Sequence, residues 1–341
     1  MSASTAEPVP FNVRGDDGPR LPEPCGPLSE AVVRALAGSD TSALPGRASD
    51  ADPMGRDLHV ALYALYELHY LGFAGVDDDL EWDPELLRLR AAMESRFLAH
   101  VRDNVEPGGD AVAEMDSLSV ESTSGSGPSW HLKDEGTWEQ MREYFAHRSM
   151  YHLKEADPHA WAIPRLRGQA KASFVAVEFD EYGGGRGERV HQELWADLMA
   201  AAGLEASYLG YLDRVSGETL ATVNLMSLFG LHRAHRGATV GHFAATEITS
   251  PSGSARLVTG LNRLGAPEAC VDFYAEHVEA DAVHEQVMRH DVVGDLLRQN
   301  PGLAGDVVFG MRALEFVEEA ASAKMMAAWE RGESSLLPGQ G

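Results

Sequence analysis

The stretch 273-FYAEHVEADAVHEQV-287 contains three metal-capable side chains, His277, Asp281 and His284, spaced four and then three residues apart. In an α-helix each residue turns by about 100°, so these positions share one stripe roughly 10 Å long. Apolar residues flank the stripe, and a carboxylate in an apolar setting must be paired, protonated or bound to a metal. From these residues alone, the stripe is either a solvated face with a His–Asp pair or one wall of a metal site.

The composition of the 341-residue chain excludes several classes of partner. With 53 acidic and 28 basic residues, the net charge is −25, and no basic patch is present that could displace counterions from nucleic acid. Cys25 and Cys270 form no CxxC pair, which argues against a disulfide framework or a thiolate metal site. The first residues lack an apolar signal region, and no run of about 18 apolar residues occurs. We therefore expect a soluble cytoplasmic protein without a membrane or nucleic-acid partner.

Helix-period patterns recur along the chain and predict an all-α protein. They begin at 56–73 and 84–103, resume at 137–166, and continue to about residue 332 with short Gly or Pro breaks. The segment 107–130 reads as a low-complexity loop, and one short helical candidate, 29–38, interrupts a leader that is rich in Pro, Gly and Ser. The predicted division is a flexible leader (1–54), accessory helices and a loop (55–135), the main helical domain (136–332) and a polar tail (333–341).

Four further polar residues lie at positions that favour metal binding. Glu247 is the only acid in an otherwise small and apolar helical stretch, so its carboxylate requires a cationic partner. Glu181 and His191 bracket a glycine-rich break, and Glu155 ends a strongly helical segment just before a proline. Together with the 277–284 stripe they make four carboxylates and three imidazoles, which would balance two divalent cations. Oxygen and imidazole ligands without thiolate suit iron or manganese better than a structural zinc, and helical bundles hold such dinuclear sites.

Other enzyme motifs fail on spacing. The stretch 171–195 has the outline of a dinucleotide-binding turn but not the GxGxxG spacing, so its glycines are interpreted as a break between two helices. A ferritin-like site needs two ExxH motifs, and only 188-ERVH-191 is present. The chain contains no HExxH metalloprotease motif, no GxSxG elbow and no P-loop.

Four stretches resemble the haem-oxygenase-like diiron oxidases and oxygenases, a family of iron-containing redox enzymes. They are 153-LKEADPHAWAIPRLRGQAKA-172, 180-DEYGGGRGERVH-191, 241-GHFAATEITSP-251 and 274-YAEHVEADAVHE-285. The resemblance covers about residues 137–330. It implies a haem-oxygenase-like bundle of about seven helices that holds a non-haem diiron centre in 136–332, with additional N-terminal helices before it.

The resemblance also implies roles for individual carboxylates. By position, Glu247 is expected to be the bridging carboxylate. Glu155 matches an extra carboxylate ligand of the N-oxygenating branch, and these two are the expected catalytic carboxylates. Glu188 is a reserve ligand, and Asp180 is a candidate acceptor that orients a ligand histidine.

The remaining expected ligands divide between two irons. The resemblance assigns His191 and His277 to one iron, and Asp281 and His284, together with Glu181, to the other.

The function that the resemblance implies is oxygen activation by two Fe(II)/Fe(III) ions, with O2 as co-substrate and an external electron donor. The Glu155 match favours N-oxygenation of a small-molecule amine or amino acid in a specialised-metabolite pathway. Desaturation, decarboxylation or C–C cleavage of an amino or fatty acid is the alternative chemistry. A non-catalytic helical metal-binding protein is the alternative of another class. A redox partner and a homodimer are further expectations.

Overall fold

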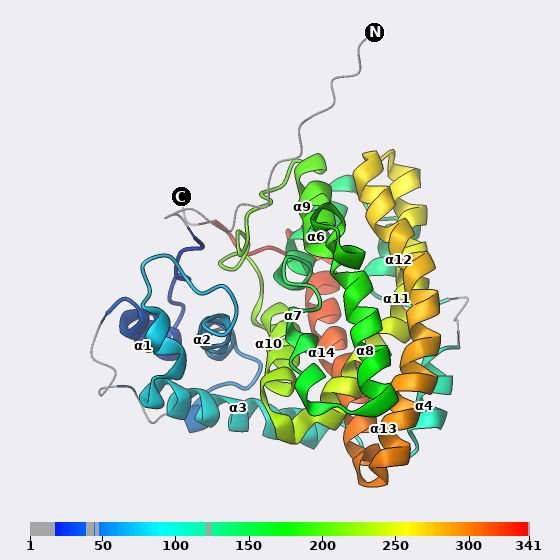
Figure 1. The fold of residues 1–341 in the computed structure, drawn as a ribbon. Helices are drawn as coiled ribbons and strands as arrows, with labels where there is room; N and C mark the ends of the chain where they lie inside the picture. The colour runs from blue at the N-terminus through cyan, green and yellow to red at the C-terminus, as the bar shows by residue number, and fades with distance from the viewer. Residues whose placement is uncertain (1–17, 39–43, 45–47, 121–123, 340–341) are drawn as a thin grey trace.

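The computed structural model describes residues 18–38, 44, 48–120 and 124–339. Within these residues every regular element is a helix and none is a strand, which confirms the all-α prediction (Figure 1). The α-helices are α1 (Pro27–Leu36), α2 (Arg56–Glu67), α3 (Pro84–Asn104), α4 (Ala111–Leu118), α5 (Pro128–Asp134), α6 (Trp138–His152), α7 (Asp157–Ala160), α8 (Gly168–Glu181), α9 (His191–Ala201), α10 (Gly217–Leu231), α11 (Arg236–Leu264), α12 (Glu268–Gln286), α13 (Gly294–Gln299) and α14 (Ala304–Glu330).

Shorter helical turns join these elements. A π-helical segment, Val287–Val293, continues α12 into α13. The 3₁₀ turns are Ala48–Asp50, Asp78–Trp82, Ile163–Arg165, Gly183–Gly185, Gly187–Arg189, Arg233–His235 and Pro301–Leu303. None of the helices in the described part of the chain is both long enough and apolar enough to span a bilayer.

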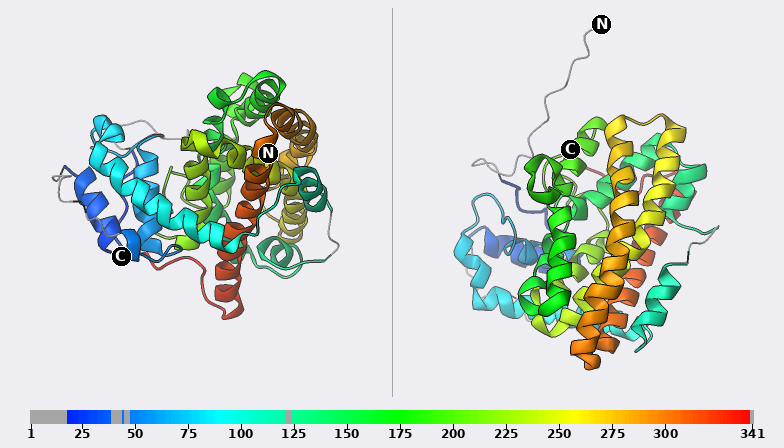
Figure 2. Two further views of the ribbon diagram at one scale, coloured as in Figure 1. Left: turned by 90° about the horizontal axis from the view of Figure 1, so that it is seen from below. Right: turned by 45° about the vertical axis from the view of Figure 1, so that its right-hand side comes forward.

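Helix α11 is the centre of the main bundle. It packs along α12 on one side and α14 on another, while α1, α2 and α3 lie together beside the bundle in every view (Figures 1 and 2). Gly265 ends α11 in the left-handed conformation with φ 66°, which lets the chain reverse directly into α12. The two helices that carry Glu247 and the 277–284 stripe are therefore antiparallel neighbours.

Glycines allow α11 and α14 to approach closely. A Cβ atom added to Gly241 would collide with the carbonyl of Val307, and one added to Gly310 would collide with the carbonyl of Ala238. Backbone atoms cannot move aside as a flexible side chain can, so only glycine fits at these two positions. This close contact fixes the depth at which α11 lies in the bundle.

We predict that Gly241→Ala lowers the free energy of unfolding by about 1–3 kcal/mol, because the added methyl group forces α11 and α14 apart. Urea unfolding followed by circular dichroism measures the effect. Gly302→Ala is the matched control, because no atom lies within 4 Å of the position of its added Cβ. Equal stability of the two variants would contradict the packing argument.

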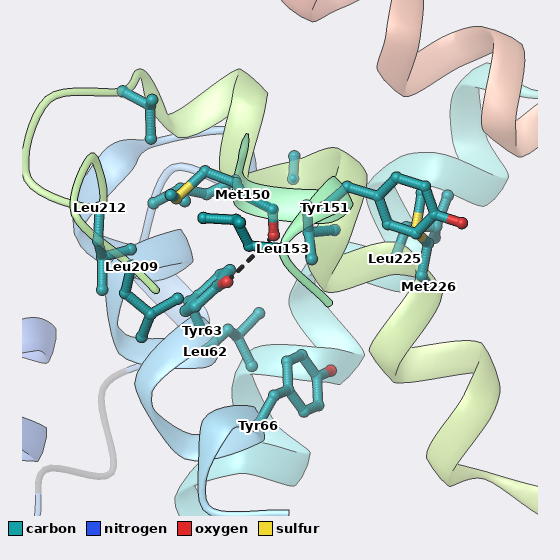
Figure 3. Close-up of a cluster of buried hydrophobic side chains, with 14 of the residues drawn as sticks. Leu62, Tyr63, Tyr66, Met150, Tyr151, Leu153, Leu209, Leu212, Leu225 and Met226 are labelled. Carbon is teal, nitrogen blue, oxygen red and sulfur yellow. Dashed lines mark hydrogen bonds between the residues drawn. The ribbon is translucent and has the colours of Figure 1, made fainter. Parts of the chain in front are cut away.

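The N-terminal helices share a hydrophobic core with the bundle. Figure 3 shows Leu62 and Tyr63 of α2 among side chains from the end of α6, from the loop before α10 and from α10 itself. The hydroxyl of Tyr63 donates a hydrogen bond to the carbonyl of Met150 at 3.2 Å. Accessory helices and bundle are therefore joined by buried apolar contacts.

A buried ion pair reinforces this junction. The ammonium of Lys154 lies 2.5 Å from Oε2 of Glu67, the last residue of α2, and Tyr208 donates a hydrogen bond to Oε1 of the same carboxylate at 2.8 Å. The ammonium also lies over the rings of Tyr63 and Tyr70, at 4.5 and 4.4 Å from their centroids. The pair fixes the turn after α6, where the first candidate metal ligand is located.

Helix α1 confirms the predicted short helix 29–38, and the predicted loop 107–130 is more ordered than its composition indicates. Helix α1 lies in the predicted leader 1–54, and Leu28 and Val32 bury its apolar face. Residues 1–17, 39–43 and 45–47 of that leader, like 340–341 of the predicted tail, lie outside the described residues. The predicted loop 107–130 contains α4 and the start of α5, because Asp110 caps α4 and Pro128 starts α5.

Candidate metal centre

Five segments of the bundle bring the seven candidate ligands to one place. They lie in the turn after α6, at the end of α8, at the start of α9, in the middle of α11 and along α12. Each side chain is at most 6% exposed. The seven are Glu155, Glu181, His191, Glu247, His277, Asp281 and His284.

The seven side chains form two groups that have one member in common. In each group, one ligand atom per residue lies within 4.8 Å of every other. The first group is Glu155, Glu181, His191 and His277, and the second is Glu181, Glu247, Asp281 and His284. Both groups combine carboxylate oxygens with imidazole nitrogens.

The carboxylate shared by the two groups is Glu181, whereas the resemblance implied that Glu247 bridges. Oε2 of Glu181 lies 2.7 Å from Nδ1 of His191, while its Oε1 lies 3.5 Å from Nδ1 of His284. The two oxygens of Glu181 thus face different groups. Glu247 projects from α11 and belongs only to the second group, where it lies 3.1 Å from Nδ1 of His284.

The glycine break places Glu181 next to His191. Gly183 has φ 73°, and a Cβ atom at this position would lie 2.6 Å from the backbone of Arg189. A side chain is excluded on both counts, so glycine allows the chain to fold back between α8 and α9. The interpretation of these glycines as a break between two helices is confirmed.

Hydrogen bonds orient two of the histidines. Nδ1 of His277 donates to the carbonyl of Phe273 at 2.7 Å, which leaves Nε2 directed at the first group. His284 directs Nδ1 at the second group, and its Nε2 lies 3.3 Å from Asp180. Asp180 therefore lies where the sequence suggested, as an acceptor behind a candidate ligand.

The unsatisfied polar atoms of the first group fit a cation. Oε2 of Glu155, Nδ1 of His191 and Nε2 of His277 are buried and have no hydrogen-bond partner among the described residues. Although Nδ1 of His191 is close to Glu181, the contact lacks hydrogen-bond geometry. Buried polar atoms usually have a hydrogen-bond partner, and these three have none in the part of the chain that the structure describes. A metal ion bound between them would accept the lone pairs of all three atoms. Nitrogen and oxygen ligands of this kind suit iron.

Burial strongly perturbs the pKa values of the second group. It raises the pKa of Glu247 well above its usual range, and neighbouring Asp281 and Glu181 add to the effect. Burial also raises the pKa of Asp281 to about 6, against the opposing influence of His277. Burial would lower the pKa of His277, but the nearby Glu155 carboxylate raises it to about 10. Protons therefore neutralise part of the charge when no cation does so.

Comparison with known proteins identifies the family. A family model described as "iron-containing redox enzyme" matches residues 142–318, which is more than half of the chain. The chain belongs to this family. The resemblance seen in the sequence, the haem-oxygenase-like helical fold and assignment to iron-containing oxidoreductases are thereby confirmed.

One curated relative of this iron-containing redox enzyme also matches. It is nitrosourea synthase of Streptomyces achromogenes subsp. streptozoticus, which is 22% identical over 232 residues. The match covers 66% of this chain and 49% of the relative. The matched region thus spans about half of the relative's length.

His152 lies beside the first group of candidate ligands. Its Nδ1 lies 2.8 Å from Oε1 of Glu155, and its ring packs on Trp195. The spacing of three residues between His152 and Glu155 is the signal that could have revealed the contact. The reserve ligand Glu188 is exposed and belongs to neither group.

We predict that Glu181→Ala abolishes the binding of both metal ions, because Glu181 belongs to both groups. Glu155→Ala and Glu247→Ala should each weaken the binding of one ion. Metal analysis after anaerobic Fe(II) loading measures the bound iron per chain. Glu188→Ala is the control: it removes an exposed carboxylate three residues before His191 that belongs to neither group, so this variant should bind as much iron as the unmodified protein. Retention of two ions by Glu181→Ala would refute the shared position.

Metal affinity should rise with pH. At neutral pH the raised pKa values keep protons on Glu247 and on His277, whose pKa is about 10, and a cation must displace them. Binding therefore releases protons, and raising the pH favours it. Titration calorimetry in buffers of different ionisation enthalpy, from about pH 6 to about pH 8, measures both effects. Affinity that is independent of pH, with no buffer-dependent heat, would contradict the prediction.

Proposed function

We propose that this protein is a non-haem diiron oxygenase that N-oxygenates a small amine or amino acid. Glu155, His191 and His277 would hold one iron, and Glu247, Asp281 and His284 would hold the other, with Glu181 available to both groups. The two groups that share one carboxylate support two ions rather than one.

A cavity beside the candidate ligands is the observation that carries the proposal. It has a volume of about 310 Å³, and five of the seven candidate ligands line it. The five are Glu155, Glu181, Glu247, His277 and Asp281. This size lies at the lower end of the range for small-molecule sites. A non-catalytic metal-binding protein needs no such chamber, so the cavity favours an enzyme.

The chain's own residues prepare this cavity for oxidation chemistry. Tyr151, Met226 and Phe273 line it with apolar surface next to the ligands and limit the entry of water. When bound, the iron pair would activate O2 with two electrons from an external donor, so that one oxygen atom enters the substrate and the other leaves as water.

Two observations support nitrogen as the atom that is oxidised. Glu155, the extra carboxylate that the resemblance associates with N-oxygenation, lies in the first group and lines the cavity. The matching relative is named for a nitrosourea product, which contains an oxidised nitrogen. N-oxygenation of an amine is therefore the reaction that we assign to the centre.

The test is oxygen consumption by protein loaded with Fe(II). We expect the loaded protein to take up O2 faster when a substrate amine or amino acid is added, and mass spectrometry to show one oxygen atom added to nitrogen. Glu181→Ala should abolish the uptake, because it removes the shared ligand. Protein that binds two irons and consumes no oxygen would exclude the oxygenase function.

A further inference from the structure

Arg148 of α6 lines the cavity, and only one nitrogen of its guanidinium group, Nη1, donates hydrogen bonds within the described part of the chain. Nη1 donates hydrogen bonds to both carboxylate oxygens of Glu318 on α14, at 2.8 and 2.9 Å. Nε is buried without a hydrogen-bond partner, and Nη2 donates to none of the described residues. Nε and Nη2 form the edge of the guanidinium group that binds a carboxylate with two parallel hydrogen bonds. Glu318 thus holds Arg148 in place and leaves that edge unused.

Tyr274 adds a second unused donor to the same cavity. Its side chain is 4% exposed, and its hydroxyl has no hydrogen-bond partner within the described part of the chain. Tyr274 and Arg148 both line the cavity. A buried hydroxyl without a partner is unfavourable, and a bound acceptor would remove that cost.

Helical spacing places Tyr274 about one turn from the candidate ligand His277, and Arg148 about one turn from His152, which contacts the candidate ligand Glu155. Arg148 precedes His152 by four residues on α6, a rise of about 6 Å, and Tyr274 precedes His277 by three residues on α12, a rise of about 4.5 Å. Side chains of α6 and α12 are in contact, as the ring pairs Phe145–Tyr274 and His152–Phe273 show, so the two donors come from helices that meet beside the candidate metal centre. An acceptor that reaches both would be bound at a fixed distance from the reacting atom.

We propose that Arg148 and Tyr274 form an anion subsite that binds the carboxylate of the substrate, so that the enzyme selects amines with a carboxylate over simple amines. The inference rests on the proposed oxygenase function, which places the substrate's nitrogen at the metal ligands. Arg148 and Tyr274 are specificity-determining residues, and Glu318 is a positioning residue that holds the guanidinium group.

The test compares amino acids with the amines that lack only the carboxylate. The probes are L-lysine and cadaverine, L-ornithine and putrescine, and L-arginine and agmatine, and calorimetry measures their binding to protein loaded with Zn(II), which is redox-inert. We expect the amino acid of at least one pair to bind about tenfold tighter than its amine, as a charge-assisted hydrogen bond predicts. Arg148→Met should reduce that ratio to about one, and Tyr274→Phe should reduce it several-fold.

Two further variants separate recognition from stability. Arg142→Met removes a positive charge from the same helix at a position outside the cavity wall, so it should keep the preference. Arg148→Lys keeps a charge without the planar edge, so it should show an intermediate ratio while preserving the fold. Equal binding within all pairs, no binding of any amino acid, or an unchanged ratio in Arg148→Met would each overturn the subsite. Because Zn(II) supports no redox chemistry, these results are independent of oxygen consumption, which tests the proposed function.

Discussion

Four buried carboxylates next to one another are the constraint on which the centre depends. Four largely buried side chains converge here, and like charges at such distances cannot all remain ionised without compensation. They are Glu155, Glu181, Glu247 and Asp281. Protons and imidazolium groups supply part of the compensation, as the raised pKa values show. Two divalent cations would supply all of it. The arrangement of α8, α9, α11 and α12 makes sense as the scaffold that holds these charges together until cations bind.

Much of the site could be predicted from the sequence because its signals are local. The 277–284 stripe follows from helical periodicity, and Glu247 is conspicuous as a single acid in an apolar helix. The carboxylate that the two groups share could not be predicted, because this position depends on how α8 meets α12, a distance that no spacing within one helix encodes. Glu181 takes this position because its two oxygens face different helices. Similarly, the unused edge of Arg148 depends on Glu318, which lies 170 residues away in the chain.

The helices could be predicted where the hydrophobic periodicity is strong, but not where a capping residue determines whether a short helix forms. Long amphipathic stretches such as 84–103 predict α3 almost to its ends. Helix α4 is short, and its formation rests on the Asp110 cap and on packing, so the polar composition of 107–130 was misleading. The position of α11 against α14 depends on Gly241 and Gly310, which read in the sequence as poor helix formers. In the bundle the absence of a side chain is what permits the contact.

The ion pair between Lys154 and Glu67 sets the limits of the unit that can fold alone. The family region starts at residue 142, yet Lys154 within it depends on an anion in α2. Excision at residue 142 would remove Glu67 and leave the buried ammonium group of Lys154 without its counter-charge. Removing one partner of a buried ion pair destabilises a fold by about 3–5 kcal/mol. The region that matches the family is therefore shorter than the region that we expect to fold independently. A recombinant or evolutionary transfer of the metal-binding region would have to include α2 as well.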